Sequence, residues 1–333
     1  MNDAPRGQCS GNEGSYTMTA TLREVEKVEI FTLQDNYIDL VIGDDSEVVQ
    51  RARPLGGLDY SNSILAEHGF SALVTVTEGD TRRSILFDFG FSEHGALTNA
   101  KGQAVDLSRV EALVLSHGHM DHTGGFGDLV RAVGKPGIPL VAHPTVFRRP
   151  RFVRLSETLR AEMPPFTREQ ATGAGVSIVE TREPYPLLDG HLLFLGEISR
   201  RTEFEQGMPN ARYEENGEEK WDPIEDDTGI AVNVRGKGLV VLSGCAHSGI
   251  VNTVNHARAV TGVETVYAIM GGFHLTGPAL ASVIEPTTRA LQRIAPKYVV
   301  PCHCTGRAAT MHIEKAMPEQ FILNMAGTRL TFA

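Results

Sequence analysis

The sequence has no long apolar run. No stretch of its 333 residues approaches the roughly 18 to 20 consecutive apolar residues that a membrane-spanning helix needs. The N-terminus also lacks the succession of charged, apolar and small residues that is typical of a secretory signal peptide. We therefore expect a cytoplasmic protein that does not associate with a membrane.

Positive charge and cysteine are also scarce. The 31 Lys and Arg residues are outnumbered by 41 Asp and Glu residues, and the formal net charge is -10. A surface that binds a nucleic-acid backbone needs clustered positive charge, so we exclude nucleic acid as a partner and expect a small-molecule substrate, leaving the oligomeric state open. The four cysteines, Cys9, Cys245, Cys302 and Cys304, are too few for a disulfide framework, which indicates reduced thiols.

Large apolar side chains are nearly absent from residues 1–20, which are rich in Gly, Ser, Asn and Asp. Such a composition does not repay the entropy of ordering, so we predict a flexible N-terminal leader there. Residues 21–333 are predicted to form a single domain. Within it, about residues 203–227 are polar and acidic and contain the turn signal Asn216-Gly217, which predicts a long surface loop.

Short apolar runs alternate with helical stretches along the rest of the chain. They predict strands at residues 28–33, 72–76, 84–88, 112–115, 139–142, 239–242, 265–270 and 298–300. Glu78-Gly79-Asp80 predicts a hairpin turn between the second and third of these strands, and a helix is expected at about residues 126–132. This alternation favours a layered α/β architecture.

Histidines follow the ends of four predicted strands. They are His117, His247, His274 and His303. In layered α/β folds, the side chains that carry out chemistry collect where strands end and loops begin. We therefore expect these four imidazoles to converge.

Three imidazoles and one carboxylate lie within six positions directly after the strand at 112–115. They are His117, His119, Asp121 and His122. Imidazole and carboxylate are ligands of zinc, manganese and iron, and four such side chains on one turn can supply two neighbouring cations. Gly118 is expected to give the loop the freedom to aim the flanking imidazoles at one point. The cluster predicts a binuclear site with two divalent metal ions, zinc first, with manganese or iron as alternatives.

The motif His117-x-His119-x-Asp121-His122 resembles the signature of the metallo-β-lactamase-fold superfamily. Phe87-Asp88-Phe89-Gly90 is similar to the earlier Asp-x-Gly motif of that superfamily. The resemblance implies a four-layer αββα sandwich with a binuclear site at one edge of its two sheets. It also implies that Asp88 braces the metal-binding loop from behind the ligands.

Further segments resemble one branch of this superfamily, whose members are described as 7,8-dihydropterin-6-methyl-4-(β-D-ribofuranosyl)-aminobenzene-5'-phosphate synthase-like proteins. The matching segments are residues 35–36, 65–71, 243–252, 270–275 and 301–306. These matches extend over most of the chain.

The resemblance also implies a distribution of metal ligands. His117 and His119 would hold one ion, whereas Asp121 and His122 would belong to the second. His303 is similar to the last histidine ligand of the superfamily and would complete the second site.

The sequence departs from the superfamily pattern at two positions. Leu195-Gly196-Glu197-Ile198 has no histidine where the superfamily usually offers a ligand, and Gly244-Cys245 stands where a bridging aspartate would be. His247 lies two residues past Cys245 and is our candidate for the missing imidazole, with a structural hydrogen bond to the backbone as the alternative. We expect Cys245 to be a small buried side chain behind the ligands, with a thiolate ligand as the alternative.

Other residues are candidates for the pocket wall. His274 follows two glycines at a strand end and could bind metal, donate to substrate or transfer a proton, so we predict catalytic roles for Asp121 and His274. By resemblance, His68 and His143 could line the pocket, although ordinary structural roles would explain them equally. Arg148 could bind a phosphate or carboxylate group of the substrate, with a solvated surface position as the alternative.

Three enzymatic functions are compatible with these residues. The leading expectation is a metal-dependent hydrolase, in which a metal-bound hydroxide attacks a small-molecule ester, phosphoester or lactone. The alternative is a synthase that condenses a reduced pterin with an aminobenzene ribose phosphate. A second alternative is an iron-dependent oxidoreductase. A binding module without catalysis is disfavoured by the intact cluster of ligand-type residues.

Overall fold

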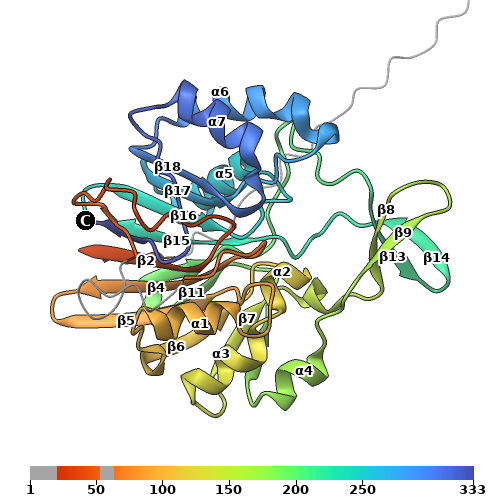
Figure 1. Cartoon of the computed structure of the whole chain (residues 1–333), viewed down its shortest axis with the longest axis horizontal. Helices are drawn as coiled ribbons and strands as arrows, with labels where there is room; N and C mark the ends of the chain where they lie inside the picture. The colour runs from red at the N-terminus through yellow and green to blue at the C-terminus, as the bar shows by residue number, and fades with distance from the viewer. Residues whose placement is uncertain (1–20, 53–63) are drawn as a thin grey trace, which may run out of the picture.

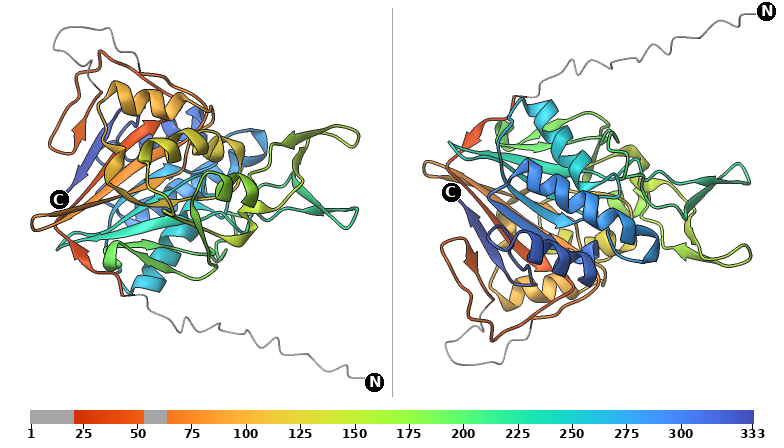
Figure 2. Two further views of the ribbon diagram at one scale, coloured as in Figure 1. Left: turned by 90° about the horizontal axis from the view of Figure 1, so that it is seen from below. Right: turned by 90° about the horizontal axis from the view of Figure 1, so that it is seen from above.

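Two β-sheets face each other between two layers of helices. The structure is a computed structural model that describes residues 21–52 and 64–333, so the leader predicted at residues 1–20 lies outside the described residues. Figure 1 shows helices α5, α6 and α7 outside one sheet and α1 and α3 outside the other, and Figure 2 shows the same layers from two further sides. This is the predicted four-layer αββα sandwich.

The first sheet contains eight strands in the order β10-β7-β6-β5-β4-β2-β19-β3. Its strands are β2 (Lys27–Gln34), β3 (Val49–Gln50), β4 (Ser71–Glu78), β5 (Thr81–Phe87), β6 (Val110–Val114), β7 (Pro139–Ala142), β10 (Ser177–Glu180) and β19 (Arg329–Phe332). Glu78 pairs with Thr81, so the predicted hairpin turn joins β4 and β5. From β5 to β10 the strands are parallel, which brings their C-terminal ends to one edge of the sheet.

The second sheet is seven-stranded, in the order β11-β12-β15-β16-β17-β18, with β1 beside β15. Its strands are β1 (Glu24–Val25), β11 (Tyr185–Leu187), β12 (Leu192–Phe194), β15 (Gly229–Val234), β16 (Gly238–Ser243), β17 (Val266–Gly272) and β18 (Tyr298–Cys302). Strands β16, β17 and β18 are parallel, so their C-terminal ends also meet at one edge.

The main core lies between the two sheets. Phe87 and Val114 of the first sheet and Leu242 and Met270 of the second belong to one buried cluster. All six residues of β16 are buried because helices cover its other face, which explains its continuous apolar sequence.

Helices form the outer layers of the sandwich. The described helices, of which α2 lies at the edge of the sheets, are α1 (Gly95–Gly102), α2 (Met120–Thr123), α3 (Phe126–Val133), α4 (Arg168–Gly173), α5 (Ile250–Thr261), α6 (Ile284–Ile294) and α7 (Arg307–Ala316). Among residues 21–52 and 64–333, none of the helices combines the length and the apolar character needed to cross a bilayer.

A small four-stranded sheet projects from the sandwich as an arm (Figure 2). Its strands are β8 (Arg151–Arg154), β9 (Arg160–Met163), β13 (Ala211–Glu215) and β14 (Glu218–Trp221). The segment predicted as a long loop at about 203–227 therefore contains a hairpin. The sequence pattern does not indicate these strands because they are short and charged, and ion pairs such as Arg154 with Glu219 join them across the arm.

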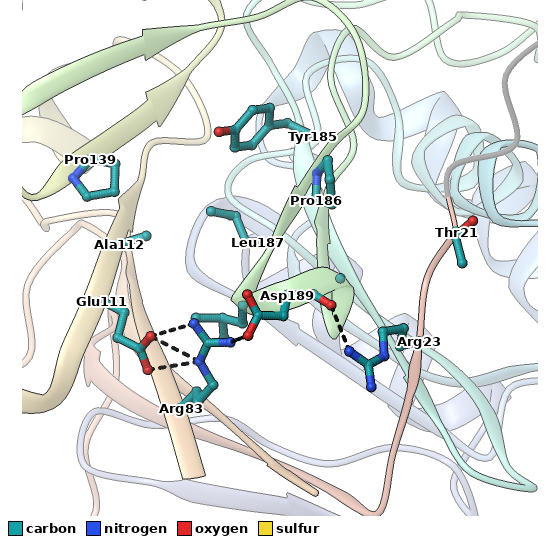
Figure 3. A pocket seen from close by; sticks show the side chains of 12 residues that line it. Thr21, Arg23, Arg83, Glu111, Ala112, Pro139, Tyr185, Pro186, Leu187 and Asp189 are labelled. Atoms are coloured by element: carbon teal, nitrogen blue, oxygen red, sulfur yellow. Dashed lines mark hydrogen bonds and ion pairs between the residues drawn. The ribbon is translucent and has the colours of Figure 1, made fainter. Parts of the chain in front are cut away.

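A hollow opens at the opposite ends of the parallel strands, between the two sheets (Figure 3). Arg83 and Glu111 lie near the N-terminal ends of β5 and β6, and the Arg83 guanidinium donates to both Glu111 and Asp189. Arg23 donates to the backbone carbonyl of Asp189. The charged side chains of this hollow thus have protein partners, and the interaction of Arg83 with Asp189 joins the two sheets.

Candidate metal centre

The candidate ligands converge on the edge of the sandwich where the parallel strands end. His117 and His119 follow β6, Cys245 and His247 follow β16, and His303 follows β18. Their nitrogen and sulfur atoms form two neighbouring groups with a carboxylate oxygen of Asp121 and a ring nitrogen of His122, both in α2. The prediction that imidazoles from separate strand ends converge is confirmed.

The first group contains His117, His119 and His247. One ring nitrogen of each lies within 4.8 Å of those of the other two. The ring centroids are 4.5 Å apart for His117 and His119, and 4.9 Å apart for His247 and each of the others. Three imidazoles in this arrangement match the protein ligands of one zinc-type ion. Glu197, from the segment where the superfamily usually has a histidine, instead pairs with His143 and Arg182.

The second group contains Asp121, His122, Cys245 and His303, again with ligand atoms within 4.8 Å of one another. His303 Nε2 lies 3.2 Å from Asp121 Oδ2, and His122 Nε2 lies 3.1 Å from Cys245 Sγ. The Cys245 sulfur therefore stands among the candidate ligands rather than behind them. Burial raises the pKa of this thiol, and a bound cation would favour its thiolate.

Asp88 fixes the orientation of rings in both groups. Its Oδ2 accepts from the Ser116 hydroxyl at 2.7 Å and from His122 Nδ1 at 2.7 Å, and its Oδ1 accepts from the Ser116 amide. Because the Ser116 proton points to Asp88, the Ser116 oxygen accepts from His117 Nδ1 at 3.0 Å. Both rings then carry their proton on Nδ1 and present the lone pair of Nε2 to the centre.

Several of these buried ring nitrogens have no protein partner. His117 Nε2 and both ring nitrogens of His247 make no hydrogen bond with the described residues. His303 Nδ1 donates to Asn36 Oδ1, which leaves the lone pair of His303 Nε2 facing the Asp121 carboxylate. Buried lone pairs that face one another are unfavourable without a proton or cation between them, so the residues fit a metal centre. Ligation by each residue stays a prediction.

The electrostatics of the two groups differ. Burial, followed by the neighbouring imidazoles, lowers the pKa of His117 and His247 well below the usual range, and burial lowers that of His303 to about 4. Burial also lowers the pKa of His122, but the carboxylates of Asp121 and Asp88 outweigh it and raise this pKa. Carboxylates that favour a proton on His122 would also favour a divalent cation there.

The backbone is strained where the strands lead into the centre. Asp88, Ala246, His274 and His303 have φ values of 56°, 52°, 42° and 47°. They are four of the ten described non-glycine residues with positive φ, and each lies shortly after a strand of the sandwich. Such a conformation costs about 1–3 kcal/mol and is typical of functional sites.

Gly118 lies between two candidate ligands, and the atoms around it leave no room for a side chain. Its φ is not in the left-handed region, but an added Cβ would lie 2.1 Å from the carbonyl oxygen of Val146. We therefore expect Gly118→Ala to displace the loop, lowering the stability by about 1–3 kcal/mol and reducing the metal content. Thermal unfolding and elemental analysis would measure both. Gly173→Ala, with nothing within 4 Å of the added carbon, is the control, and equal behaviour of the two variants would contradict the prediction.

His274 and His68 lie beside the metal centre. The ring centroid of His274 is 4.2 Å from that of His247, and burial lowers its pKa to about 4. His68 Nδ1 accepts from the Asn36 amide, so its Nε2 carries the proton and points to Asp121 Oδ2, 3.6 Å away. The His68 side chain is 61% exposed, which leaves it accessible to a substrate.

The other two tentative substrate residues are occupied by protein partners. His143 Nδ1 accepts from the Thr145 amide, and its Nε2 donates to Glu197 at 3.2 Å. The Arg148 guanidinium lies over the ring of Tyr213, and it forms ion pairs with Asp222 and Glu225. In the structure the His143 and Arg148 side chains therefore hold loops together, and substrate binding by either residue stays a prediction.

The sequence analysis missed three buried carboxylates near the centre. Asp226 pairs with Arg151 and accepts from the Gly118 amide at 2.8 Å. Asp227 accepts from the Ser248 amide, and burial raises its pKa to about 6. Glu205 accepts from two amides in the first turn of α5, and burial raises its pKa to about 7. All three fall in the polar segment predicted as a surface loop. Acidic residues in such a segment are expected to be exposed, so the sequence did not indicate that they are buried.

Comparison with known proteins assigns this arrangement to a family. The family model described as the metallo-beta-lactamase superfamily matches residues 66–260, which is more than half of the chain. The chain belongs to the metallo-beta-lactamase superfamily. The matched residues include the whole run from Asp88 to His247, so the family assignment covers every candidate ligand except His303.

Two curated relatives and one crystal structure illustrate the similarity of this superfamily member to known proteins. A Methanocaldococcus jannaschii protein named 7,8-dihydropterin-6-methyl-4-(beta-D-ribofuranosyl)-aminobenzene-5'-phosphate synthase is 30% identical over 323 residues, covering 95% of this chain and all of that one. An uncharacterised protein of the same organism is 28% identical, covering 72% of this chain and 85% of the other. The crystal structure of Tm1679, a metal-dependent hydrolase of the beta-lactamase superfamily, has a TM-score of 0.68 at 24% identity, covering 92% of this chain and 98% of that one.

Proposed function

We propose that this protein is a synthase that condenses a reduced pterin with an aminobenzene ribose phosphate at a metal centre. The observation that carries the proposal is the similarity to the M. jannaschii synthase, which extends over the full length of that protein. The two groups of ligand-type side chains support a metal-dependent reaction. The substrate would be a small molecule, with no nucleic acid or membrane partner.

The leading expectation from the sequence, a metal-dependent hydrolase, is wrong. The relative that is similar over its full length is named a synthase, which supports the alternative reading instead. The likeness to a named hydrolase is at 24% identity and therefore shows the fold alone. One fold of this kind supports many reactions, so the fold does not argue for hydrolysis here.

The metal content is part of the proposal. We propose two divalent ions, one in the trio of His117, His119 and His247 and one in the group around Asp121, with zinc first and manganese or iron as alternatives. When bound, these ions would stabilise the negative charge that develops on the leaving group. Elemental analysis of the purified protein identifies them, and an iron-only protein that consumes oxygen would instead support the oxidoreductase alternative.

The side chains around the metals have roles in this reaction that follow from their protonation. A bond forms between the methyl carbon at pterin position 6 and the amine nitrogen, the leaving group takes the electron pair of its bond to that carbon, and the amine loses a proton. His274 is neutral at neutral pH because its pKa is about 4, so one of its ring nitrogens can accept that proton transiently. His68 Nε2 can donate a hydrogen bond to an oxygen of either substrate.

Formation of the coupled product tests the proposal. Protein loaded with zinc or manganese is incubated with 4-(β-D-ribofuranosyl)-aminobenzene 5'-phosphate and a reduced pterin that carries an ester-linked leaving group on its 6-methyl carbon. Mass spectrometry should detect the coupled product, and protein dialysed against a chelator should form none until metal is restored. Release of the leaving group to water without any coupled product would contradict the proposal.

A further inference from the structure

A cavity of about 610 Å³ adjoins the metal centre. Its wall includes residues 35–37, the end of β18 and one side of α7. Asn36 and His303 belong both to this wall and to the surroundings of the metals, since Asn36 Oδ1 accepts from His303 Nδ1 and Asn36 Nδ2 donates to the His303 carbonyl. A molecule in the cavity can therefore reach the edge of the metal centre.

Part of the cavity wall is apolar and aromatic. Tyr37 and Met311 are 46% and 54% exposed although both are large apolar side chains, and Leu323 and Pro301 extend the same wall. Sites of about 300–1,000 Å³ with mainly apolar walls and a few polar groups are typical for small molecules. A flat ring could bury its faces against Tyr37 and Met311.

One face of α7 supplies the charged groups. Arg307, Thr310, Met311 and Glu314 all line the cavity, and their spacing of three, four and seven residues places them on one side of the helix. At about 1.5 Å per residue, Arg307 and Glu314 are separated by about 10 Å along the axis. Arg307 is near the His303 end, and Glu314 is at the far end. Neither side chain has an ion pair or hydrogen bond with another residue in the described part of the chain.

We propose that this cavity is the binding site of the reduced pterin. The pyrimidine edge of the pterin, with its 2-amino group and ring N–H, donates to the Glu314 carboxylate, and the rings lie against Tyr37 and Met311. The 6-methyl carbon then points toward His303, with Arg307 positioned for an anionic leaving group. This assignment rests on the proposed function.

The order of charges along α7 distinguishes the two substrates. A carboxylate accepts two parallel hydrogen bonds from an edge with two neighbouring donors, which the pterin has. An aminobenzene ribose phosphate that kept its amine near the metals would place its phosphate toward the far end, where the like charge of Glu314 would repel it. The cavity therefore fits the pterin.

Binding of the pterin alone tests this site without turnover. The metal-loaded full chain is titrated with 6-hydroxymethyl-7,8-dihydropterin, followed by fluorescence or calorimetry. Glu314→Gln should weaken binding by about tenfold or more, because it removes charge-assisted hydrogen bonds. Glu319→Gln, an exposed carboxylate outside the cavity, should bind like the wild type.

A second ligand tests whether the 2-amino group of the pterin contacts Glu314. In a 2-oxo analogue, the 2-amino donor is replaced by an acceptor, so the analogue should bind the wild type weakly and should lose no further affinity in Glu314→Gln. Equal pterin affinity of Glu314→Gln and the wild type would overturn the assignment. So would a Glu314→Gln variant in which only the affinity for the aminobenzene ribose phosphate changes. If the protein forms the coupled product but Glu314→Gln binds the pterin as the wild type does, the site assignment is wrong and the proposed function stands. If pterin binding depends on Glu314 but no coupled product forms, the site assignment stands and the proposed function is wrong.

Discussion

Replacing Asp88 with alanine should lower the affinity for metal by about 10- to 100-fold, since ligand-orienting partners contribute this much in metal sites. The Asp88 carboxylate is fully buried and accepts three hydrogen bonds, from the amide and hydroxyl of Ser116 and from His122 Nδ1. Without it, His117 and His122 lose the interactions that turn Nε2 toward the centre. The three buried donors also lose their acceptor, so the free energy of unfolding should fall by about 3 kcal/mol or more.

Metal competition with a chelator and thermal unfolding would measure the two effects of Asp88→Ala. Asp80→Ala removes an exposed aspartate in the turn between β4 and β5 and should change neither. Full metal affinity in Asp88→Ala would show that His117 and His122 are oriented without this carboxylate, contrary to the hydrogen bonds described above.

Arg151→Met should destabilise the protein by about 3–5 kcal/mol, because it leaves buried carboxylates without their cation. Arg151 is 4% exposed and pairs with Asp222, whose Oδ2 lies 2.8 Å from Arg151 Nε, and with Asp226. The two carboxylates raise the pKa of Arg151 despite its burial. Chemical denaturation should show a lower midpoint for this variant.

The same ion pairs join the projecting arm to the metal-binding loop. Arg151 begins β8, and its partner Asp226 accepts from the amide of Gly118 between two candidate ligands. Metal affinity should therefore fall together with stability. Arg154→Met, three residues along β8 and paired with Glu219 at the surface, should cost less than about 1 kcal/mol. A loss for Arg151→Met no greater than that of this control would contradict the prediction.

The convergence of the candidate ligands could be predicted from the sequence because each follows an apolar strand. The run at 239–242 indicated β16, and a parallel neighbour ends beside it, so His247 had to emerge at the same edge as His303. Asp88 was predicted by family resemblance to support the loop, and the hydrogen bonds to Ser116 and His122 supply the physical reason.

The arm and its buried carboxylates could not be predicted. Asp226 is surrounded in sequence by acidic and polar residues that are typical of a solvated loop, and its burial depends on Arg151, which lies 75 positions away. The reaction could not be predicted from the ligands either, because one fold supports many different reactions. The cavity beside α7 could not be predicted either, because residues of its wall such as Met311 and Glu314 belong to no motif.

Strand β19 lies between β2 and β3 in the first sheet, although the strand before it in sequence belongs to the second sheet. It pairs Leu330 with Ile30, two residues 300 positions apart. Contacts between such distant residues close a very large loop, and proteins dominated by non-local pairing fold slowly. The edge of β2 that faces β19 therefore has no partner until the residues of β19 fold onto it, and an unpaired edge strand is a general site of aggregation.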